Sequence, residues 1–475
     1  IVATVGPSCA TASDLGRMIQ AGVDVFRFNL SHGNHDSHRQ AIARARSAAE
    51  RHGRPVGILL DLQGPKVRTA KNEGGVLIPL RRGEEIRISA GRGYSTERAI
   101  VVDYSGLVRD VKVGDRLLID DGKLALQVVD RGKGALVARV MRGGMLKSRA
   151  GVNVPARALR LSVPTEKDRR DAAFAFAEGA DFLALSFVRD ASDIVRLRSM
   201  LARRASARRG HHHPLVIAKI EKPSALDHLD EILEVSDGVM VARGDLGVEL
   251  SLERVPVWQK EILHRARRRG VFTITATQML ESMVRSATPT RAEVSDVANA
   301  IFDGTDAVML SAETSTGRYP VEAVRMMDRI AAQTEVSFRL RGYAEHSPVI
   351  DATMPQVVAD AAYHAARNMG AAAIVVFTAG GSSARLVAKY RPPVPVYAFT
   401  ATDAVARQMQ VLYGVTPIVA DMVHSTDAML AQMDALLQSN GYVKKKDIVV
   451  FVAGQPIGRP GSTNMMKVHR VGESV

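Results

Sequence analysis

A lysine and a glutamate stand two positions apart where an apolar stretch ends, in the segment AKIEKPS (residues 218–224). The residues just before this segment, 214–217, are apolar and predict a buried strand. Side chains two positions apart on a strand point the same way, so Lys219 and Glu221 would face one space. Taken alone, the pair indicates either a simple ion pair or part of a charged functional site.

Polar and charged residues also follow five other apolar stretches. They are Arg27, Asn29, Ser31 and His32; Asp61, Lys66 and Arg68; Arg243 and Asp245; Thr277 and Gln278; and Ser311 and Glu313. The carboxyl ends of parallel barrel strands meet at one mouth, where barrel enzymes carry their active sites, so we expect one shared site. The alternative is a purely structural ring of ion pairs at that mouth.

Glu221 and Asp245 would bring two carboxylates together at this mouth. They repel each other unless a cation lies between them, and a hard divalent ion such as Mg²⁺ prefers oxygen ligands. Lys219 cannot bind that ion while it is protonated, so it would face a second anion. Paired carboxylates, a metal ion, a lysine and arginines are together typical of a phosphoryl-transfer site.

The segment RGDLGVEL (residues 243–250) adds a candidate anion site. Gly244 and Gly247 permit tight turns, and we expect a short helix to start near Leu246. The free N–H groups of its first turn would suit a substrate carboxylate. The alternative is a plain turn that Asp245 caps.

Short strand-like segments alternate with longer amphipathic segments over most of the first 337 residues. The predicted strands are residues 1–6, 24–29, 56–62, 181–187, 215–221, 238–245, 271–278 and 306–313. The predicted helices are residues 13–22, 34–52, 166–178, 191–206, 224–234, 251–269, 289–302 and 320–337. Eight such units predict an α/β fold, a closed (β/α)8 barrel of the TIM type.

Two further regions do not follow this alternation. Residues 70–156 combine short alternating strands with Gly and Asp-Gly turns, which predicts a small antiparallel β-barrel inserted after the third barrel strand, a lid domain. Residues 338–475 alternate strands and helices again and predict a separate open α/β domain. The barrel domain would then comprise residues 1–69 and 157–337.

The composition is that of an ordinary globular protein, with 46% apolar and 24% charged residues. No signal peptide and no run of ~20 apolar residues is visible. The single cysteine, Cys9, suits a reducing compartment. We therefore expect a cytoplasmic protein with no membrane partner.

The net charge of +14 has two interpretations, a nucleic-acid partner or small acidic substrates. Much of the excess lies in residues 203–213, 265–270 and 444–446, where aromatic residues are not interleaved. Stacking of bases is therefore not indicated, solvated helix ends explain these runs better, and we expect no nucleic-acid partner. His211 to His213 lie in the first run, but no other ligand stands at metal-site spacing.

Several segments, in order along the chain, resemble the pyruvate kinase family. They are FRFNLSHG (26–33), DLQGPKVRT (61–69), AKIEKPS (218–224), VMVARGDLGVEL (239–250), TATQMLESM (275–283), residues 289–320 and AKYRPPVPV (388–396). The block at 289–320 is very specific, and the resemblance spans essentially the whole chain. It implies a glycolytic enzyme that transfers phosphate from phosphoenolpyruvate to ADP, giving pyruvate and ATP.

The resemblance also implies roles for individual residues. Lys219 would stabilise the phosphoryl group in transfer, Glu221 and Asp245 would bind Mg²⁺ or Mn²⁺, and a second Mg²⁺ would arrive with the nucleotide. The other implied site residues are Arg27 and Arg68 for phosphate; Ala242, Arg243 and Gly244 for the substrate carboxylate; Thr277 and Ser311 for the enolate and its proton; and Asn29, His32 and Arg68 for the nucleotide. The lid would close over the mouth and exclude water.

Asn29, Ser31, Asp61 and Leu62 match residues that hold K⁺ in many members of this family. Those members carry Glu where this chain has Lys66. A fixed ammonium there would supply the charge that K⁺ supplies elsewhere. We therefore expect activity without added K⁺.

The C-terminal domain resembles the effector domain of the family, which is usually tetrameric, so we expect a homotetramer that is regulated there. The segment TAGGSS (378–383) would bind a phosphorylated effector, a sugar phosphate or a nucleotide. The residues concerned are Thr378, Gly380, Gly381, Ser382 and Ser383. An ordinary loop is the alternative interpretation.

Two other functions fit part of the pattern. A Mg²⁺-dependent lyase or aldolase acting on pyruvate or phosphoenolpyruvate would also place Glu and Asp around a metal, but it would need neither the lid nor Lys66 and Arg68. A basic nucleic-acid-binding protein would show a steep salt dependence, but the charge excess lies mostly outside the motifs.

Overall fold

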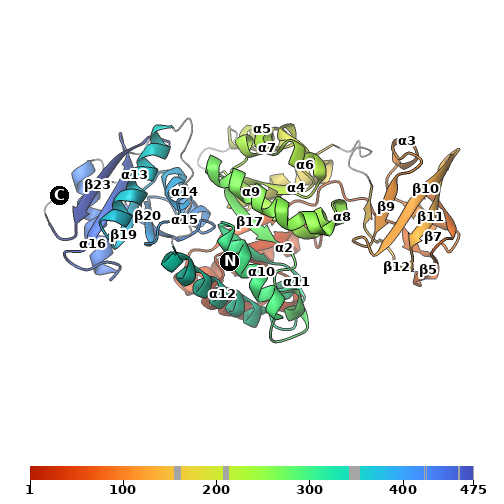
Figure 1. Cartoon of the computed structure of the whole chain (residues 1–475), viewed down its shortest axis with the longest axis horizontal. Coiled ribbons are helices and arrows are strands. Elements are labelled where there is room, and N and C mark those ends of the chain that lie inside the picture. The colour runs from red at the N-terminus through yellow and green to blue at the C-terminus, as the bar shows by residue number, and fades with distance from the viewer. Residues whose placement is uncertain are drawn as a thin grey trace.

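Eight parallel strands form a closed barrel in the computed structural model, which describes residues 1–154, 162–206, 213–341, 353–421, 423, 425–457 and 461–473 (Figure 1). The order around the barrel is β1, β2, β3, β14, β15, β16, β17 and β18. These strands are β1 Val2–Thr4, β2 Val25–Asn29, β3 Gly57–Asp61, β14 Phe182–Leu185, β15 Leu215–Ile220, β16 Gly238–Ala242, β17 Phe272–Ala276 and β18 Ala307–Leu310. The predicted (β/α)8 barrel is confirmed.

Helices follow the strands and cover the outside of the barrel (Figure 1). The main ones are α1 Ala12–Ala21, α2 His35–Arg51, α4 Glu166–Ala177, α5 Ala191–Ser206, α6 Pro223–Asp227, α7 Leu229–Val235, α9 Val255–Arg269, α10 Arg291–Phe302 and α12 Pro320–Arg341. Capping boxes at Asn34, Thr165 and Thr290 start α2, α4 and α10. The single helix predicted for 224–234 is divided into α6 and α7, because His228 leaves the helical conformation (φ −109°, ψ 21°).

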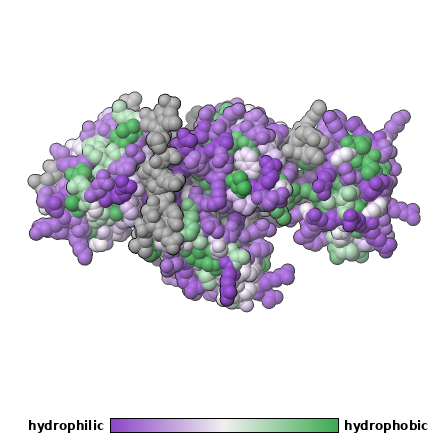
Figure 2. All heavy atoms as spheres, viewed as in Figure 1, coloured by the Kyte–Doolittle hydropathy of each residue, from purple (hydrophilic) through white to green (hydrophobic). Residues whose placement is uncertain are grey.

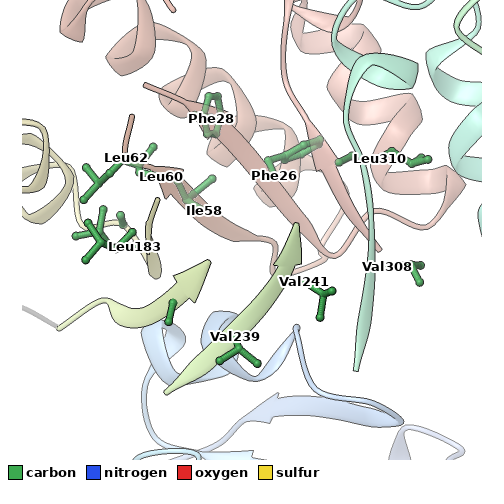
Figure 3. Close-up of a cluster of buried hydrophobic side chains, with 14 of the residues drawn as sticks. Phe26, Phe28, Ile58, Leu60, Leu62, Leu183, Val239, Val241, Val308 and Leu310 are labelled. Carbon is green, nitrogen blue, oxygen red and sulfur yellow. The ribbon is translucent and has the colours of Figure 1, made fainter. Parts of the chain in front are cut away.

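Alternation along the strands separates the hydrophobic core from the polar positions. On β2, Phe26 and Phe28 pack into the layer between strands and helices, and Figure 3 shows them with other members of that layer. Arg27 lies between them in sequence, so it faces the barrel interior. On β3, Leu60 belongs to the outer layer and Asp61 faces inward in the same way.

The barrel interior is apolar at the amino-terminal ends of the strands. Val25 and Ile217 lie there and belong to one hydrophobic cluster with residues of the C-terminal domain such as Met409. Arg27 and Lys219 lie two residues further along the same strands and therefore on the same inner face. The barrel thus has an apolar base, covered by the C-terminal domain, and a polar mouth.

The chain between β3 and α4 forms a separate sheet domain, drawn at the right of Figure 1. Its main sheet has the order β13, β9, β10, β11, β6 and β8. The strands of this domain are β4 Lys71–Asn72, β5 Ile78–Leu80, β6 Glu85–Ala90, β7 Tyr94–Ser95, β8 Ala99–Val102, β9 Arg116–Ile119, β10 Leu124–Gly132, β11 Ala135–Arg142, β12 Gly144–Leu146 and β13 Val152–Asn153. Most pairs are antiparallel, but β6 pairs with β8 and β4 with β7 in parallel, because the chain crosses over between them.

The main sheet of the inserted domain is open along its length. Among the residues that the structure describes, its edge strands β13 and β8 are joined only through the hinge, where Arg68 bridges Gly151 and Thr69 bridges Val102. The inserted domain is therefore an open sheet with two single bridges near its edges, rather than the small closed barrel that the sequence predicts, because β13 is too short to form a longer ladder. The predicted domain boundary at residue 156 lies outside the described residues.

The C-terminal region forms an open α/β sheet with the order β21, β20, β19, β22 and β23. Its elements are α13 Met354–Asn368, β19 Ala373–Phe377, α14 Ser382–Ala388, β20 Val396–Thr400, α15 Asp403–Met409, β21 Val415–Val419, α16 Thr426–Ser439, β22 Ile448–Gly454 and β23 Thr463–Arg470. The last strand, β23, is antiparallel to β22 and is not among the predicted strands.

Polar contacts attach the C-terminal domain to the barrel base. Arg407 Nε donates to Asp181 Oδ1 at 2.9 Å, and Gln408 Nε2 donates to Asp181 O at 3.1 Å. Gln410 Nε2 donates to the carbonyl of Pro55 at 2.8 Å. These acceptors precede β14 and β3, so the base of the barrel is held against this domain while the mouth is left open.

The face of the molecule in Figure 2 is mostly hydrophilic, with hydrophobic residues in small patches. Val76, Tyr94 and Val113 are the most exposed large apolar side chains described in the inserted domain. Within the described ranges, none of the helices has the length and apolar character needed to cross a membrane.

Candidate active site

Lys219 lies at the centre of a buried ion-pair network at the barrel mouth. Its Nζ is 2.8 Å from Glu221 Oε1 and 3.3 Å from Asp61 Oδ1. It also donates a hydrogen bond of 2.7 Å to Ser186 Oγ. Strand β15 positions Lys219 and Glu221, β3 ends at Asp61, and Ser186 follows β14. Three neighbouring strands therefore bring these side chains together.

The charges of this network act strongly on one another. Burial would lower the pKa of Lys219, but Asp61 and Glu221 outweigh it and raise that pKa above its ordinary value. Burial also opposes ionisation of Asp61, yet Lys219 and Arg27 bring its pKa below the usual range. Burial raises the pKa of Glu221, and Asp245 raises it further. Glu221 is thus the carboxylate that would gain most from another cation.

Glu221 and Asp245 form a donor set that fits a divalent metal ion. Their mutual repulsion shows that the two carboxylates lie within electrostatic reach. In the part of the chain that the structure describes, no group of three or more His, Cys, Asp or Glu side chains could hold a metal by itself. Mg²⁺ commonly takes one or two carboxylates and completes its shell with water and substrate oxygens. Two carboxylates at an open mouth meet that requirement.

Helix α8, Arg243–Glu249, starts earlier than predicted. We expected it near Leu246, but Gly244 and Asp245 already belong to its first turn. An acidic residue in the first turn is favoured by the helix dipole, which explains the earlier start. Asp245 is therefore fixed on a helix directly after β16, rather than on a loose turn.

Arg27, His32, Lys66 and Arg68 gather on one side of the mouth. Arg27 donates from Nε and Nη2 to Asp61 Oδ2 at 2.8 and 2.6 Å. Burial lowers the pKa of His32, and the three neighbouring cations lower it further. His32 is therefore neutral at pH 7 and can serve as either donor or acceptor. This side of the mouth is suited to phosphate oxygens.

Arg68 lies at the hinge between the barrel and the inserted domain. Its backbone N–H donates to Asp103 Oδ1 at 2.7 Å, and its Nη1 donates to Arg149 O at 3.2 Å. Both partners belong to the inserted domain. A movement of that domain would therefore carry Arg68 with it.

The residues predicted to hold K⁺ already have partners inside the protein. Asn29 Oδ1 accepts a hydrogen bond of 3.1 Å from the Ser31 amide, and the Leu62 carbonyl accepts one of 2.7 Å from a side-chain hydroxyl. Asp61 is paired with two cations. Lys66 is exposed, and it forms no ion pair with any residue in the described ranges.

Thr277 has a strained backbone directly after β17. Its φ is +72°, and that of Gln278 is +53°, a region that β-branched residues seldom adopt. Two hydrogen bonds hold the Thr277 hydroxyl: it donates to Ala276 O at 2.6 Å and accepts from the Gly244 amide at 2.7 Å. The hydroxyl therefore joins β17 to the first turn of α8.

The side chain of Arg243 supports this turn. Its Nη2 donates to Thr277 O at 2.8 Å and also pairs with Asp296 Oδ2 at 2.8 Å. The guanidinium is therefore already engaged within the protein. Any contact of Arg243, or of Ala242 before it, with a substrate would involve the backbone.

Ser311 follows β18 and presents an unused hydroxyl. Its Oγ is buried and has no hydrogen-bond partner among the described residues, whereas its amide donates to Glu313 Oε2 at 2.7 Å. A buried hydroxyl without a partner is costly and rare. This atom is therefore available to a ligand or a water molecule at the mouth.

Thr4, Ser186 and Phe187 belong to the network but are not among the predicted site residues. Thr4 Oγ1 accepts a bond of 3.0 Å from the arginine of β2, and the Phe187 amide donates to Glu221 Oε2 at 2.7 Å. The rule applied to the other strand ends would also have found Thr4 and Ser186. Phe187 contributes a backbone group at φ +59°, for which its residue type carries no signal.

A second buried contact, here called the latch, joins the inserted domain to α8. It consists of Asn153, Lys222 and Glu249. Lys222 Nζ pairs with Glu249 Oε1, and Asn153 Nδ2 donates to the same oxygen at 3.1 Å. Lys222 also lies 5.4 Å from the centroid of the Phe187 ring. Because α8 carries Asp245, the latch connects the inserted domain to a candidate metal ligand.

The predicted effector segment, residues 378–383, follows β19 and continues into the first turn of α14. Gly381 caps α14 at φ +80°, a conformation that favours glycine. Ser383 Oγ is buried and lies 2.6 Å from Thr463 Oγ1, so this hydroxyl holds β23. Thr378 is buried as well, whereas Ala379, Gly380, Gly381 and Ser382 reach the surface.

The basic run at residues 265–270 forms surface ion pairs. Arg265 Nε pairs with Glu261 Oε1 at 2.6 Å, and Arg269 Nη1 pairs with Asp230 Oδ1 at 3.1 Å. Residues 207–212, which include two of the three histidines, lie outside the described residues.

Comparisons with known proteins agree along the whole chain. Residues 1–324 match the family model for the pyruvate kinase barrel domain, and residues 356–469 match that for the pyruvate kinase alpha/beta domain. The chain is 46% identical over 477 residues to a pyruvate kinase of Geobacillus stearothermophilus and 42% identical over 478 residues to one of Bacillus licheniformis, covering 100% of this chain and 80% of each relative. A crystal structure of a pyruvate kinase from Cryptosporidium parvum matches with a TM-score of 0.91 and 35% identity, over 99% of this chain and 95% of that one.

Proposed function

Because the chain belongs to the pyruvate kinase family, we propose that it transfers the phosphoryl group of phosphoenolpyruvate to ADP, giving pyruvate and ATP. The observation that carries this proposal is Lys219, whose ammonium lies within 3.3 Å of both Asp61 and Glu221 at the barrel mouth. A phosphoryl group in transfer spreads negative charge over its oxygens. A fixed, buried cation stabilises that charge without reorganising.

In this reaction the bond from phosphorus to the enol oxygen breaks, and a bond to a terminal oxygen of ADP forms. Arg27 would hold the phosphoryl group from one side, since its pairing with Asp61 fixes its position. Arg68 would approach from the hinge together with the inserted domain, residues 70–156. Closure of that domain would exclude water, which otherwise competes as phosphoryl acceptor. His32 and Asn29 would contact the nucleotide.

Glu221 and Asp245 would hold the divalent ion, Mg²⁺ or Mn²⁺. When bound, this ion offsets negative charge on substrate oxygens and orients them. The second Mg²⁺ implied by the family would accompany the nucleotide. The backbone at Ala242 to Gly244 would bind the substrate carboxylate.

The enolate that remains after transfer must take up a proton at its terminal carbon to become pyruvate. Thr277 is held rigidly beside α8 by its two hydrogen bonds and would line the space around that carbon. The buried, unpartnered hydroxyl of Ser311 would bind a water molecule and pass a proton inward. These roles follow from the family and are supported by the geometry.

An assay with phosphoenolpyruvate and ADP, coupled to lactate dehydrogenase, tests the function. We expect NADH oxidation that requires both substrates, stops when EDTA removes the divalent ion, and returns when Mg²⁺ or Mn²⁺ is added. A lyase or aldolase acting on the same substrate class would release pyruvate without ADP. Pyruvate release independent of ADP would therefore overturn the proposal.

Two acidic residues of α8 test the metal assignment. In Asp245→Asn we expect Mn²⁺ binding, followed by electron paramagnetic resonance, to weaken by at least ~10-fold. Glu249→Gln is the matched control, because Glu249 lies on the same helix but belongs to the latch. Equal Mn²⁺ affinity in the two variants would contradict the assignment.

We also propose that the enzyme needs no K⁺, because Lys66 supplies a permanent positive charge near the pocket of Asn29, Ser31, Asp61 and Leu62. Activity in K⁺-free buffer should match activity in K⁺. Lys66→Glu, which introduces the residue of K⁺-dependent relatives, should require K⁺. Strong stimulation of the unchanged protein by K⁺ defeats this part of the proposal.

Regulation and assembly are further proposals from the family. A phosphorylated effector would bind at residues 378–383 of the C-terminal domain, where Gly380, Gly381 and Ser382 reach the surface. The enzyme would be a cytoplasmic homotetramer. Analytical ultracentrifugation, and assays with sugar phosphates and nucleoside monophosphates, would test these statements.

A further inference from the structure

A pocket lies between the barrel base and the C-terminal domain, at the opposite end of the barrel from the mouth. It is lined from the barrel by Arg267, Gly270, Val271, Phe272, Gly304 and Asp306, and from the C-terminal domain by Arg385, Lys389 and Arg391. The pocket is narrow and partly open to solvent. Figure 1 shows α14 next to the side of the barrel that carries β17.

The pocket collects positive charge from both domains. Four of its lining residues are Arg or Lys, whereas Asp306 is the one acidic residue in the described lining. Two of these guanidinium groups meet beside Gly304: a Cβ built there would lie in ordinary contact with both, 3.7 Å from Arg267 Nη1 and 3.9 Å from Arg391 Nε.

Asp306 compensates this charge only in part. Its Oδ2 accepts bonds of 2.9 and 3.1 Å from the amide and hydroxyl of Thr273, and its Oδ1 accepts one from the Tyr413 amide at 3.4 Å. Both carboxylate oxygens are thus engaged by neutral donors. The nearest carboxylate to Arg385, that of Asp237, is 3.9 Å away and is already bonded to Arg198 at 2.7 Å.

Lys389 is the least compensated of the four cations. Its Nζ is buried and has no hydrogen-bond partner among the described residues. The ring of Tyr390 lies beside it, with its centroid 5.1 Å from the Nζ. Burial lowers the pKa of Lys389; the charge of Asp360 opposes this shift only in part, and the charge of Arg267 adds to it. A buried ammonium with three unused donors is costly unless an acceptor binds.

We propose that this pocket is an oxyanion site that binds a phosphate group, with Lys389, Arg267 and Arg385 as its ligands. The group is either free inorganic phosphate or the phosphate of a small metabolite. Because its ligands come from both domains, occupancy would tie the C-terminal domain to the barrel base. The site is separate from residues 378–383, which lie at the other end of α14.

Thermal unfolding of the full chain tests the proposal. At matched ionic strength, inorganic phosphate should raise the Tm of the unchanged protein more than chloride does. In Lys389→Met the larger part of that shift should disappear, with an apparent affinity at least tenfold weaker, and Arg267→Gln should behave in the same way. The matched controls are Lys444→Met and Arg268→Gln, which alter exposed residues and should retain the full shift.

Phosphate can also bind at the barrel mouth, so Lys219→Met separates the two sites. The Lys389-dependent shift should persist in Lys219→Met. If the whole shift is lost in Lys219→Met, or is the same in Lys389→Met as in the unchanged protein, the pocket is not a phosphate site. Glucose 6-phosphate identifies the source: a larger Lys389-dependent shift than with inorganic phosphate supports a metabolite, and a smaller one supports the free ion.

Discussion

The two ends of the barrel both bury positive charge, but they compensate it differently. At the mouth, Lys219 is paired with Asp61 and Glu221, and these carboxylates raise its pKa. At the base, Lys389 has no hydrogen-bond partner among the described residues, and burial lowers its pKa. The same chemical group is thus stabilised at one end and left uncompensated at the other.

The difference indicates what each end can bind. At the mouth, the carboxylates of Asp61, Glu221 and Asp245 surround Lys219 and Arg27, so a further cation is favoured there and can bring an anionic substrate with it. At the base, four cationic residues surround one carboxylate, so an anion is favoured. In each region the sign of the uncompensated charge predicts the sign of the ligand.

The largest effect should come from Lys219→Met at the mouth. Removing a charge that stabilises the transition state should lower kcat by ~10²–10³-fold or more, measured in the coupled assay. Mn²⁺ binding should remain, because Glu221 and Asp245 are unchanged. Lys444→Met at an exposed position should leave kcat as it was. A decrease in kcat of less than tenfold would show that the ion pairs of Lys219 at the mouth serve the structure and not the reaction.

Asp61→Asn should have the next largest effect, on stability. Arg27 and Lys219 would lose a buried partner, which should cost ~3–5 kcal/mol and lower the urea midpoint. The folded pKa of Asp61 lies below its unfolded value of 3.8, so this stabilisation is fully present above pH 3.8 and is lost as pH falls through the folded pKa. The difference in unfolding free energy between the unchanged protein and Asp61→Asn should therefore stay constant from pH 7 to pH 5. A difference that disappears within that range would contradict the ion-pair assignment.

Lys389→Met at the base should change stability much less and in the opposite direction. No carboxylate among the described residues loses an ion-pair partner at hydrogen-bond distance, so in phosphate-free buffer the free energy of unfolding, measured with urea, should stay the same or rise by up to ~1 kcal/mol. Lys219→Met, which leaves Asp61 and Glu221 facing each other, should lower it. If both variants lower the midpoint equally, the contrast between mouth and base is wrong.

Periodicity alone was enough to predict the barrel and much of its mouth. The spacing of Lys219 and Glu221 determined their shared direction, and the rule for strand ends located Asp61 and Asp245. Contributions from the backbone could not be predicted, because the Phe187 amide depends on a positive φ that its residue type does not favour. The pocket at the base was missed because Arg267 and Lys389 are distant in sequence and meet only when the two domains pack.

Cys9 provides the smallest test, because it lies just outside the mouth. Its Sγ is 3.8 Å from the carbonyl of Thr4, whose hydroxyl accepts a bond from Arg27. An uncompensated arginine nearby would lower a thiol pKa, but burial raises that of Cys9 to about 11. The thiol therefore keeps its proton at pH 8, and iodoacetamide should modify the native protein far more slowly than the protein in urea. Rapid modification of the native protein would show that the thiol is not held buried beside β1.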